Sequence, residues 1–309
     1  MALTLLRCLF ASWLLLAALP EVCAEPQVVL VSSERGYSYS EAVEAFKREL
    51  ERAGVNRQNI LDRSLDEPID TTGASLIVAL GARAAEQRAA HGSKVPLLCA
   101  LLPRASFERI LQKNGKRTSS TLSALYLDQP IGRQLDLIRL GLPKARFIGL
   151  LTGPGSQAEL GDFRSAIAAR GFQAVVAHVE AGEPLFPGLK TVLDDADVLL
   201  ALPDPQIYNS NSIQSLLLAS FRAKVPMVAF SSAYVRAGAL LAVYSTPAQI
   251  GRQAAVMALG VLGGRPLPAS GQYPTDFSVS ANEHVARSLD LDLDAPALND
   301  RLRALERRP

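Results

Sequence analysis

Residues 75–102 read SLIVALGARAAEQRAAHGSKVPLLCALL, and this stretch decides the fold class. Its two ends, 75–81 and 95–102, are apolar at nearly every position, and an alanine-rich segment at 82–90 separates them. Apolar runs without alternation are typical of strands that are buried on both faces. The alanine-rich segment favours a helix. A strand, a helix and a strand in this order predict a parallel sheet that is covered by helices.

The same alternation continues in both directions along the chain. An apolar run at 27–33 (QVVLVSS) precedes an amphipathic stretch at 38–53 and a further strand signal at 59–64. We expect more strands at 122–127, 146–151, 172–179, 197–202, 225–230 and 239–244, and helices at 104–111, 131–140, 156–170, within 186–196, at 210–223 and at 247–262. These strands are too many for one small sheet. The sequence therefore predicts an α/β protein of two doubly wound parallel-sheet lobes, with a break near residues 128–130.

The first 24 residues have the pattern of a signal peptide. One positive charge lies in residues 1–7, an apolar run covers 8–19, and small residues at Val22 and Ala24 suit cleavage after Ala24. The run is shorter than a bilayer span, which disfavours the alternative of a membrane anchor. Glu21 fits poorly in the motif that precedes a lipid-modified cysteine, so a lipoprotein starting at Cys23 is also disfavoured. We expect a periplasmic protein of residues 25–309.

Composition and missing motifs exclude several classes of function. The net charge is +2, 20% of residues are charged and no basic run occurs, which argues against a nucleic-acid partner. After cleavage Cys99 is the one remaining cysteine, and no histidine has zinc-motif spacing. The sequence lacks a phosphate-binding loop, a dinucleotide fingerprint and a nucleophile elbow. We therefore expect no enzyme, no metal and no cofactor.

Candidate ligand-binding residues come from the loops that follow the predicted strands, because open parallel sheets bind ligands at the carboxyl ends of their strands. They are Ser32, Ser33, Tyr37, Gly81, Ala82 and Pro103 in the first lobe, and Thr152, Gly153, Asp204, Ser231, Ser232 and Tyr234 in the second. Hydroxyls and backbone N–H groups suit a ligand carboxylate, and the carboxylate of Asp204 suits an ammonium group. Tyrosine rings suit an apolar or aromatic part.

These features together predict a small solute such as an amino acid. The alternative for any single residue is an ordinary turn or helix cap, and both readings of Asp204 stay open. The ligand interpretation requires Ser32, Gly81, Thr152, Asp204 and Ser231 to face a shared cavity between the lobes.

The second half of the chain resembles a known family. Residues 224–262 read KVPMVAFSSAYVRAGALLAVYSTPAQIGRQAAVMALGVL. The order of Pro226, Ser231, Val235, the Gly238-Ala239-Leu240 triplet and the run Gly251-Arg252-Gln253-Ala254-Ala255 resembles the ABC-transporter substrate-binding proteins of the tryptophan/tyrosine type, which have the type 1 periplasmic binding fold. Residues 134–149 (QLDLIRLGLPKARFIG) and 279–293 (VSANEHVARSLDLDL) are similar to further segments of that family.

The resemblance implies a domain division and a function. In such proteins the chain crosses between the lobes more than once, which implies a multi-strand hinge, a lobe 1 of residues 25–127 and 246–270 and a lobe 2 of residues 128–245 and 271–309. It implies a monomer that captures a small-molecule solute and hands it to an inner-membrane ABC permease. An alternative is a sensor or envelope accessory protein with a degenerate cleft and a protein partner. Thr152-Gly153-Pro154, where the family usually carries Asn-Pro, favours that alternative.

Overall fold

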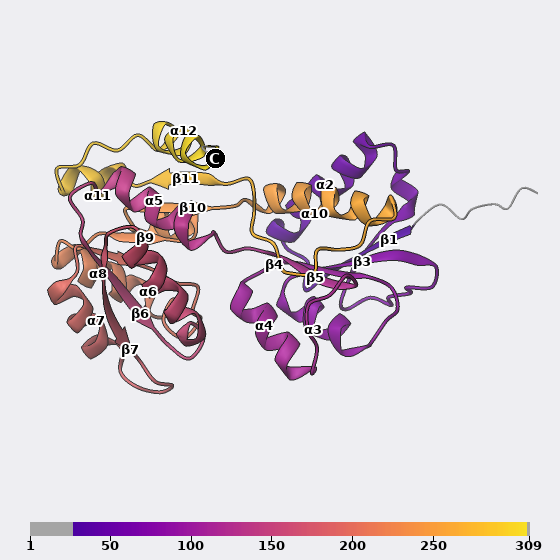
Figure 1. Cartoon of the computed structure of the whole chain (residues 1–309), viewed down its shortest axis with the longest axis horizontal. Coiled ribbons are helices and arrows are strands. Elements are labelled where there is room, and N and C mark those ends of the chain that lie inside the picture. The colour runs from indigo at the N-terminus through magenta and orange to yellow at the C-terminus, as the bar shows by residue number, and fades with distance from the viewer. Residues whose placement is uncertain (1–26, 308–309) are drawn as a thin grey trace, which may run out of the picture.

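The computed structural model describes residues 27–307, which form two lobes, each built around one sheet (Figure 1). The predicted signal peptide and its cleavage site lie outside the described residues. Both predicted sheets are present, and the predicted fold class is confirmed.

The first sheet is parallel throughout. Its strands are β1 (Gln27–Ser32), β2 (Ile60–Ser64), β3 (Ala74–Leu80), β4 (Leu97–Leu102) and β5 (Leu122–Tyr126), in the spatial order β2-β1-β3-β4-β5. Helices α2 (Tyr37–Arg52) and α10 (Pro247–Leu262) cover one face, and α3 (Ala82–Ala90) and α4 (Arg104–Lys113) cover the other. The strand order reverses between β1 and β3, which is where ligands bind in sheets of this kind.

The second sheet repeats this plan with one antiparallel edge. Its strands are β6 (Phe147–Thr152), β7 (Gln173–His178), β8 (Val198–Leu200), β9 (Met227–Ala229), β10 (Leu241–Tyr244) and β11 (Ser278–Ala281), in the order β11-β10-β9-β8-β6-β7, and only β11 runs antiparallel to its neighbour. The strand order reverses between β6 and β8.

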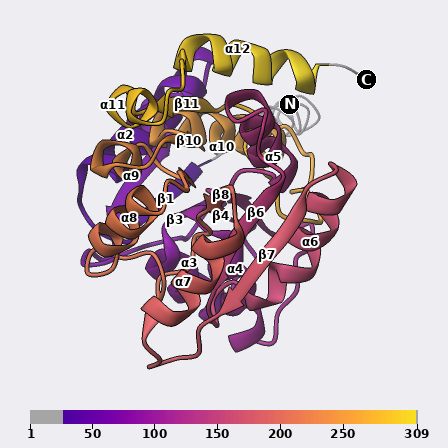
Figure 2. The same cartoon turned by 90° about the vertical axis from the view of Figure 1, so that its left-hand side faces the viewer.

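The helices of the second lobe lie on both faces of this sheet (Figure 2). Helices α5 (Ile131–Gly141), α6 (Leu160–Ala169), α11 (Glu283–Ser288) and α12 (Ala295–Glu306) contribute to one core, and α7 (Leu185–Asp195), α8 (Ile213–Arg222) and α9 (Ser232–Ala237) contribute to the other. The predicted helix at 156–170 starts later than expected, because 157–159 form a separate 3-10 turn.

Helix α10 leaves the second lobe and packs on the first. It follows β10, yet Ile250, Ala254, Ala255 and Ala258 belong to the core under β1 and β3. Its contact with α2 is so close that a Cβ atom added at Gly251 would lie 2.2 Å from the carbonyl oxygen of Ala42. Small residues on both helices therefore allow α10 to lie against the first lobe.

Three chain segments connect the lobes, and we call residues 127–130, 244–247 and 273–277 the hinge. The amide of Gln129 donates to the Ser245 hydroxyl at 3.0 Å, and that hydroxyl donates to the Asp276 carbonyl at 2.6 Å. The buried Arg133 guanidinium donates to the Gln129 side chain at 2.7 Å and to the Pro274 carbonyl at 2.9 Å. The three crossings are thus bonded to one another, while the predicted boundaries at 127, 245 and 270 stay a prediction.

Candidate functional site: the cleft between the lobes

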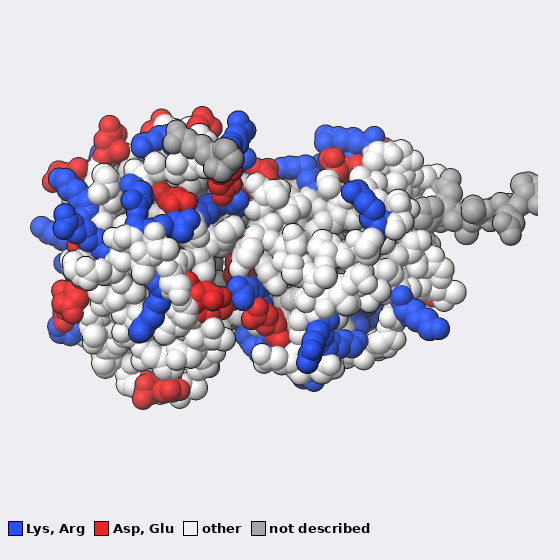
Figure 3. All heavy atoms as spheres, viewed as in Figure 1, with Lys and Arg blue, Asp and Glu red and all other residues white. Residues whose placement is uncertain are grey.

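A cavity of about 740 Å³ lies between the lobes and is lined by residues from both of them and from the hinge. The loops after the strands of both sheets and the first turns of α2 and α9 reach this cavity. Its lining consists of Tyr37, Ser38, Tyr39, Glu41, Leu101, Pro103, Leu127, Asp128, Gln129, Pro203, Phe230, Ser231, Ser232, Ala233, Arg236, Tyr244, Ser245, Thr246 and Pro247. Figure 3 shows the waist where the two lobes meet, with acidic and basic side chains close to it.

Aromatic side chains form the apolar part of this cleft. Tyr37 and Tyr39 come from the first turn of α2, Phe230 directly follows β9, and Tyr244 is the last residue of β10. The Phe230 ring is fixed by contact with the ring of Tyr234, with the two centroids 4.9 Å apart. The Tyr37 side chain, in contrast, is 84% exposed at the mouth of the cleft. It thus lines the cavity while most of its surface is open to solvent.

Charged side chains of both signs face the same cavity. Glu41 reaches it from α2, Asp128 from the hinge and Arg236 from α9. Burial raises the pKa of Asp128 to about 6, although its carboxylate accepts a hydrogen bond from the Arg104 backbone N–H. Arg236 makes one side-chain hydrogen bond, to the Ser232 hydroxyl at 3.2 Å, so most of its guanidinium N–H groups are available to a ligand.

The structure brings four of the predicted ligand-binding residues to this cavity. They are Tyr37, Pro103, Ser231 and Ser232. The other eight, which are Ser32, Ser33, Gly81, Ala82, Thr152, Gly153, Asp204 and Tyr234, are not part of its lining. Of the five residues that the ligand interpretation requires at a shared cavity, Ser231 alone lines it in this conformation.

In the first lobe the predicted residue Ser33 bonds within the lobe and does not line the cavity. The buried Ser33 hydroxyl donates to the Leu80 carbonyl at 2.9 Å and accepts from the Ala84 N–H at 2.9 Å, which caps α3. Gly81 has φ +87° and lies so close to the Tyr39 hydroxyl that an added Cβ would be 2.5 Å from it. The Tyr39 ring therefore lies against Gly81, and Tyr39 lines the cleft in its place.

In the second lobe Asp204 has an internal structural role. It is 1% exposed and accepts hydrogen bonds from the Gly153 N–H at 3.1 Å, the Ser156 hydroxyl at 2.8 Å and the Gln206 N–H at 3.0 Å. These bonds join the loop after β6 to the loop after β8. Thr152 is fully buried, with its hydroxyl 3.2 Å from His178 Nδ1. The Tyr234 hydroxyl donates to the Tyr208 carbonyl at 3.1 Å.

Sequence reasoning missed the charged and hinge residues of the cleft, namely Glu41, Asp128, Gln129, Arg236, Tyr244 and Ser245. A signal for some of them was present in the sequence. Asp128 and Ser245 stand where the chain was expected to cross between the lobes, and the floor of a cleft between two lobes is formed by the crossing segments.

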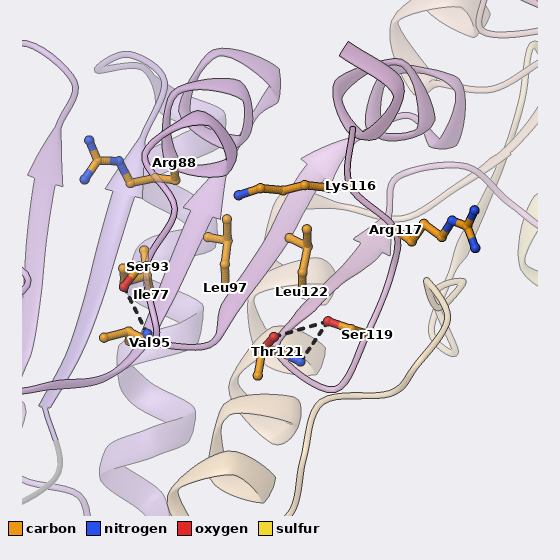
Figure 4. Close-up of a pocket in the computed structure, with 10 residues that line it drawn as sticks. All are labelled: Ile77, Arg88, Ser93, Val95, Leu97, Lys116, Arg117, Ser119, Thr121 and Leu122. Carbon is orange, nitrogen blue, oxygen red and sulfur yellow. Dashed lines mark hydrogen bonds between the residues drawn. The ribbon is translucent and has the colours of Figure 1, made fainter. Parts of the chain in front are cut away.

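A smaller hollow of about 230 Å³ lies at the amino ends of β4 and β5, far from the switch points of the sheets (Figure 4). It contains Arg88, Lys116 and Arg117, but the two arginine side chains point away from each other to opposite sides. The Lys116 ammonium donates to the Ala89 carbonyl. These positive charges do not converge, so the cleft between the lobes is the better candidate site.

Over residues 27–307 no group of three or more side chains could hold a metal ion. Within the same residues no helix is both long and apolar enough to cross a bilayer.

Comparison with known proteins identifies the family. The model of the ABC transporter substrate-binding proteins matches residues 40–293. The chain belongs to this family. The members of this family bind solutes and are not enzymes, as the sequence predicts. None of the curated proteins matches the sequence of this substrate-binding protein.

Solved structures share its fold at low sequence identity. A substrate-binding protein with adhesive properties from Clostridium difficile, in its ligand-free, open structure, is 17% identical with a TM-score of 0.69, and the match covers 87% of this chain and 96% of that one. A conserved domain protein from Vibrio cholerae is 16% identical over 89% and 97% of the two chains, with a TM-score of 0.62. The ABC domain from Streptococcus pneumoniae in complex with L-Trp is 16% identical over 89% and 98%, with a TM-score of 0.61.

Proposed function

We propose that this substrate-binding protein captures a small organic solute with both an ammonium and a carboxylate group, such as an amino acid, and delivers it to an inner-membrane ABC permease. The observation that carries the proposal is the placement of Arg236 on one lobe and Glu41 on the other, around a single cavity with aromatic walls. Opposite charges on the two sides of a cleft match the two charges of an amino acid.

Each part of such a solute has a partner in the cleft. Arg236 and the hydroxyls of Ser231 and Ser232 suit the carboxylate, since guanidinium and hydroxyl groups are strong donors. Glu41 and the hinge residue Asp128 suit the ammonium group. The rings of Tyr37, Tyr39, Phe230 and Tyr244 suit an apolar or aromatic side chain.

Capture would work through closure of the lobes about the hinge. A solute that contacts both lobes at once binds the closed form better than the open form, and this difference in affinity is what shifts the equilibrium toward closure. Membership of the family supports delivery to a permease, and the pattern of residues 1–24 supports export to the periplasm. We expect the protein to act as a monomer without a cofactor.

A sensor or accessory protein that binds a protein partner is the second candidate. It is favoured by internal hydrogen bonds in the loops after the strands. Ser33 bonds to Leu80 and Ala84, and Asp204 accepts from Gly153, so these groups are used within each lobe. A protein of this kind would bind no free solute at the cleft.

The first experiment is mass spectrometry of small molecules released from the purified protein, followed by a thermal-shift screen of the twenty amino acids. We expect at least one to raise the melting temperature. Trp13 is the single tryptophan of the chain, so in protein cleaved after Ala24 the indole emission comes from added tryptophan alone. No released molecule, no thermal shift and no change of indole anisotropy would refute solute capture.

A pair of arginine variants tests the site itself. Arg236→Gln is expected to weaken binding of the solute about tenfold or more, because it removes a charged donor from the cleft. Arg222→Gln is the matched control, since Arg222 is exposed on α8 outside the cleft. Equal affinities of the two variants would contradict the proposed pose.

A further inference from the structure

Beside the cleft, a second set of charged side chains spans the two lobes. Arg104, at the start of α4 in the first lobe, lies 3.7 Å from Glu159 and 3.7 Å from Asp162 of the second lobe. Neither Arg104 nor Glu159 lines the cavity. The contact therefore joins the lobes without belonging to the site proposed for the solute.

The Arg104 guanidinium is held firmly on its own side. It donates to Glu108 at 2.7 Å and to the Tyr273 hydroxyl at 3.1 Å. Burial opposes its charge, but these two hydrogen bonds hold the pKa of Arg104 above its usual value. It thus presents a fixed positive charge to the facing lobe.

The Glu159 carboxylate on the other side has one oxygen without a hydrogen-bond donor. Its side chain is 14% exposed, and its Oε1 atom is buried without a hydrogen bond. Charged hydrogen bonds are about 2.7–2.9 Å long, so the 3.7 Å gap to Arg104 exceeds one by about 1 Å. A buried acceptor without a donor costs free energy. A movement of the lobes toward each other would bring Glu159 within hydrogen-bonding distance of the Arg104 guanidinium, whose Nε–H donates to Glu108 in this conformation.

We propose that Arg104 and Glu159 are positioning residues for solute capture, which complete an ion pair across the edge of the cleft when the lobes close. The ionised pair favours the closed form, so it raises the affinity for the solute without touching it. This inference rests on the proposed function, because closure is what retains the solute.

The surroundings of Glu159 make this contact sensitive to pH. The groups that face it are Asp128 and Tyr273 of the hinge, Arg104 and Glu108 of α4, and Asp162 of α6. Burial, followed by the nearby negative charge of Asp128, raises the pKa of Glu159 to about 7. Below that pH the carboxylate is protonated and the attraction to Arg104 is lost. Solute affinity should therefore fall as the pH falls through 7.

The first test needs no solute. Small-angle X-ray scattering of the wild type is expected to give a larger radius of gyration at pH 5.5 than at pH 8.5, whereas Glu159→Gln stays at the larger value throughout. Glu283→Gln, which changes an exposed glutamate of α11, is the control and should behave as the wild type. Wild-type and Glu159→Gln proteins with the same radius at every pH would overturn the proposal.

The second test measures affinity, with L-tryptophan as the first probe and then any amino acid that passes the thermal-shift screen. The dissociation constant of the wild type should rise about five- to tenfold between pH 8.5 and pH 5.5. A change of this size is usual when the state of one site affects binding at another. Arg104→Met and Glu159→Gln should bind weakly and lose this dependence, and Arg104→Lys should restore part of it. A pH dependence that is unchanged in Glu159→Gln would refute the role of the ion pair. Failure of every solute to bind would instead refute solute capture, and the scattering test would then decide whether the ion pair forms.

Discussion

The hinge and the Arg104–Glu159 contact both join the two lobes, but they do so in opposite ways. In the hinge, Gln129, Arg133 and Ser245 are buried and bonded to one another and to the third crossing. At the edge of the cleft, Arg104 and Glu159 stand 3.7 Å apart, and one carboxylate oxygen is buried without a donor.

This difference shows how one molecule can be held together and still move. Buried polar groups with all partners in place contribute stability and define one geometry, whereas a half-satisfied pair leaves a second geometry within reach. The lobes are thus fixed at the hinge and adjustable at the cleft. Three substitutions measure the two contacts and a fourth changes only the mouth of the cleft; they follow from the largest expected effect to the smallest.

Arg133→Ala should be the most damaging change at the hinge. The Arg133 side chain is 5% exposed, pairs with Glu306, and binds both Gln129 and the Pro274 carbonyl. Glu306 is 34% exposed, so most of the cost comes from the oxygens of Gln129 and Pro274, which lose their donor, and we expect a loss of about 3 kcal/mol. Urea denaturation should show this loss, whereas Arg164→Ala, at an exposed position of α6, should change the free energy of unfolding by less than about 0.5 kcal/mol. Similar values for both variants would show that the hinge network contributes little.

Ser245→Ala removes the centre of the hydrogen-bond chain through the crossings. The Gln129 amide loses its acceptor and the Asp276 carbonyl loses its donor. Because Ser245 is 5% exposed, water replaces these bonds poorly, and we expect a loss of about 1–2 kcal/mol. Ser210→Ala, at an exposed position, is the control for loss of a hydroxyl.

Glu159→Gln should increase the free energy of unfolding, whereas the two hinge substitutions lower it. The folded-state pKa of Glu159 is raised to about 7 from a usual value near 4.5, so ionisation of this group opposes folding above pH 7. The glutamine variant should be more stable than the wild type by about 1 kcal/mol at pH 8.5, a figure below the full linkage value because the group is partly exposed. This gain should vanish as the pH falls from 7 toward 4.5. A loss of stability at pH 8.5 would show that the carboxylate is fully paired in solution.

Tyr37→Ala changes neither contact between the lobes. Its side chain is 84% exposed, so we expect a change in the free energy of unfolding below about 0.5 kcal/mol. Affinity for an aromatic amino acid should nevertheless fall several-fold, because the ring loses its position over the mouth of the cleft. Calorimetry with L-tryptophan and urea denaturation together separate the two effects.

The fold could be predicted because its signals are local. Unbroken apolar runs such as 75–81 and 146–151 identify buried strands, and the helices between them follow from composition and spacing. The ends of the helices and strands were harder to predict. The helix expected from residue 156 begins at Leu160, because Ser156 lies before it and bonds to Asp204.

The site was harder to predict because it depends on pairing between distant loops. Asp204 follows a core strand, which is the pattern of a ligand-binding acid, but Gly153 and Ser156 lie 51 and 48 residues away in the sequence and satisfy it internally. Glu41 and Arg236 belong to two helices that are far apart in the sequence. They lie around one cavity only because the two lobes meet there. The rule that ligands bind at the ends of strands thus identified the correct region of the molecule. The residues that bond to one another there, and those that line the cavity, could be seen only in the structure.

The path of α10 has a consequence for the order of events during synthesis. The core between α2 and the first sheet includes Ile250, Ala254 and Ala258. A growing chain that has released only its first hundred residues therefore has α2 but not α10 on this side of the sheet, and part of that apolar face is uncovered. That part stays exposed until most strands of the second sheet have also left the ribosome, so a chaperone has a long interval in which to bind it. For the same reason, no single cut in the chain can yield either half as a complete folding unit.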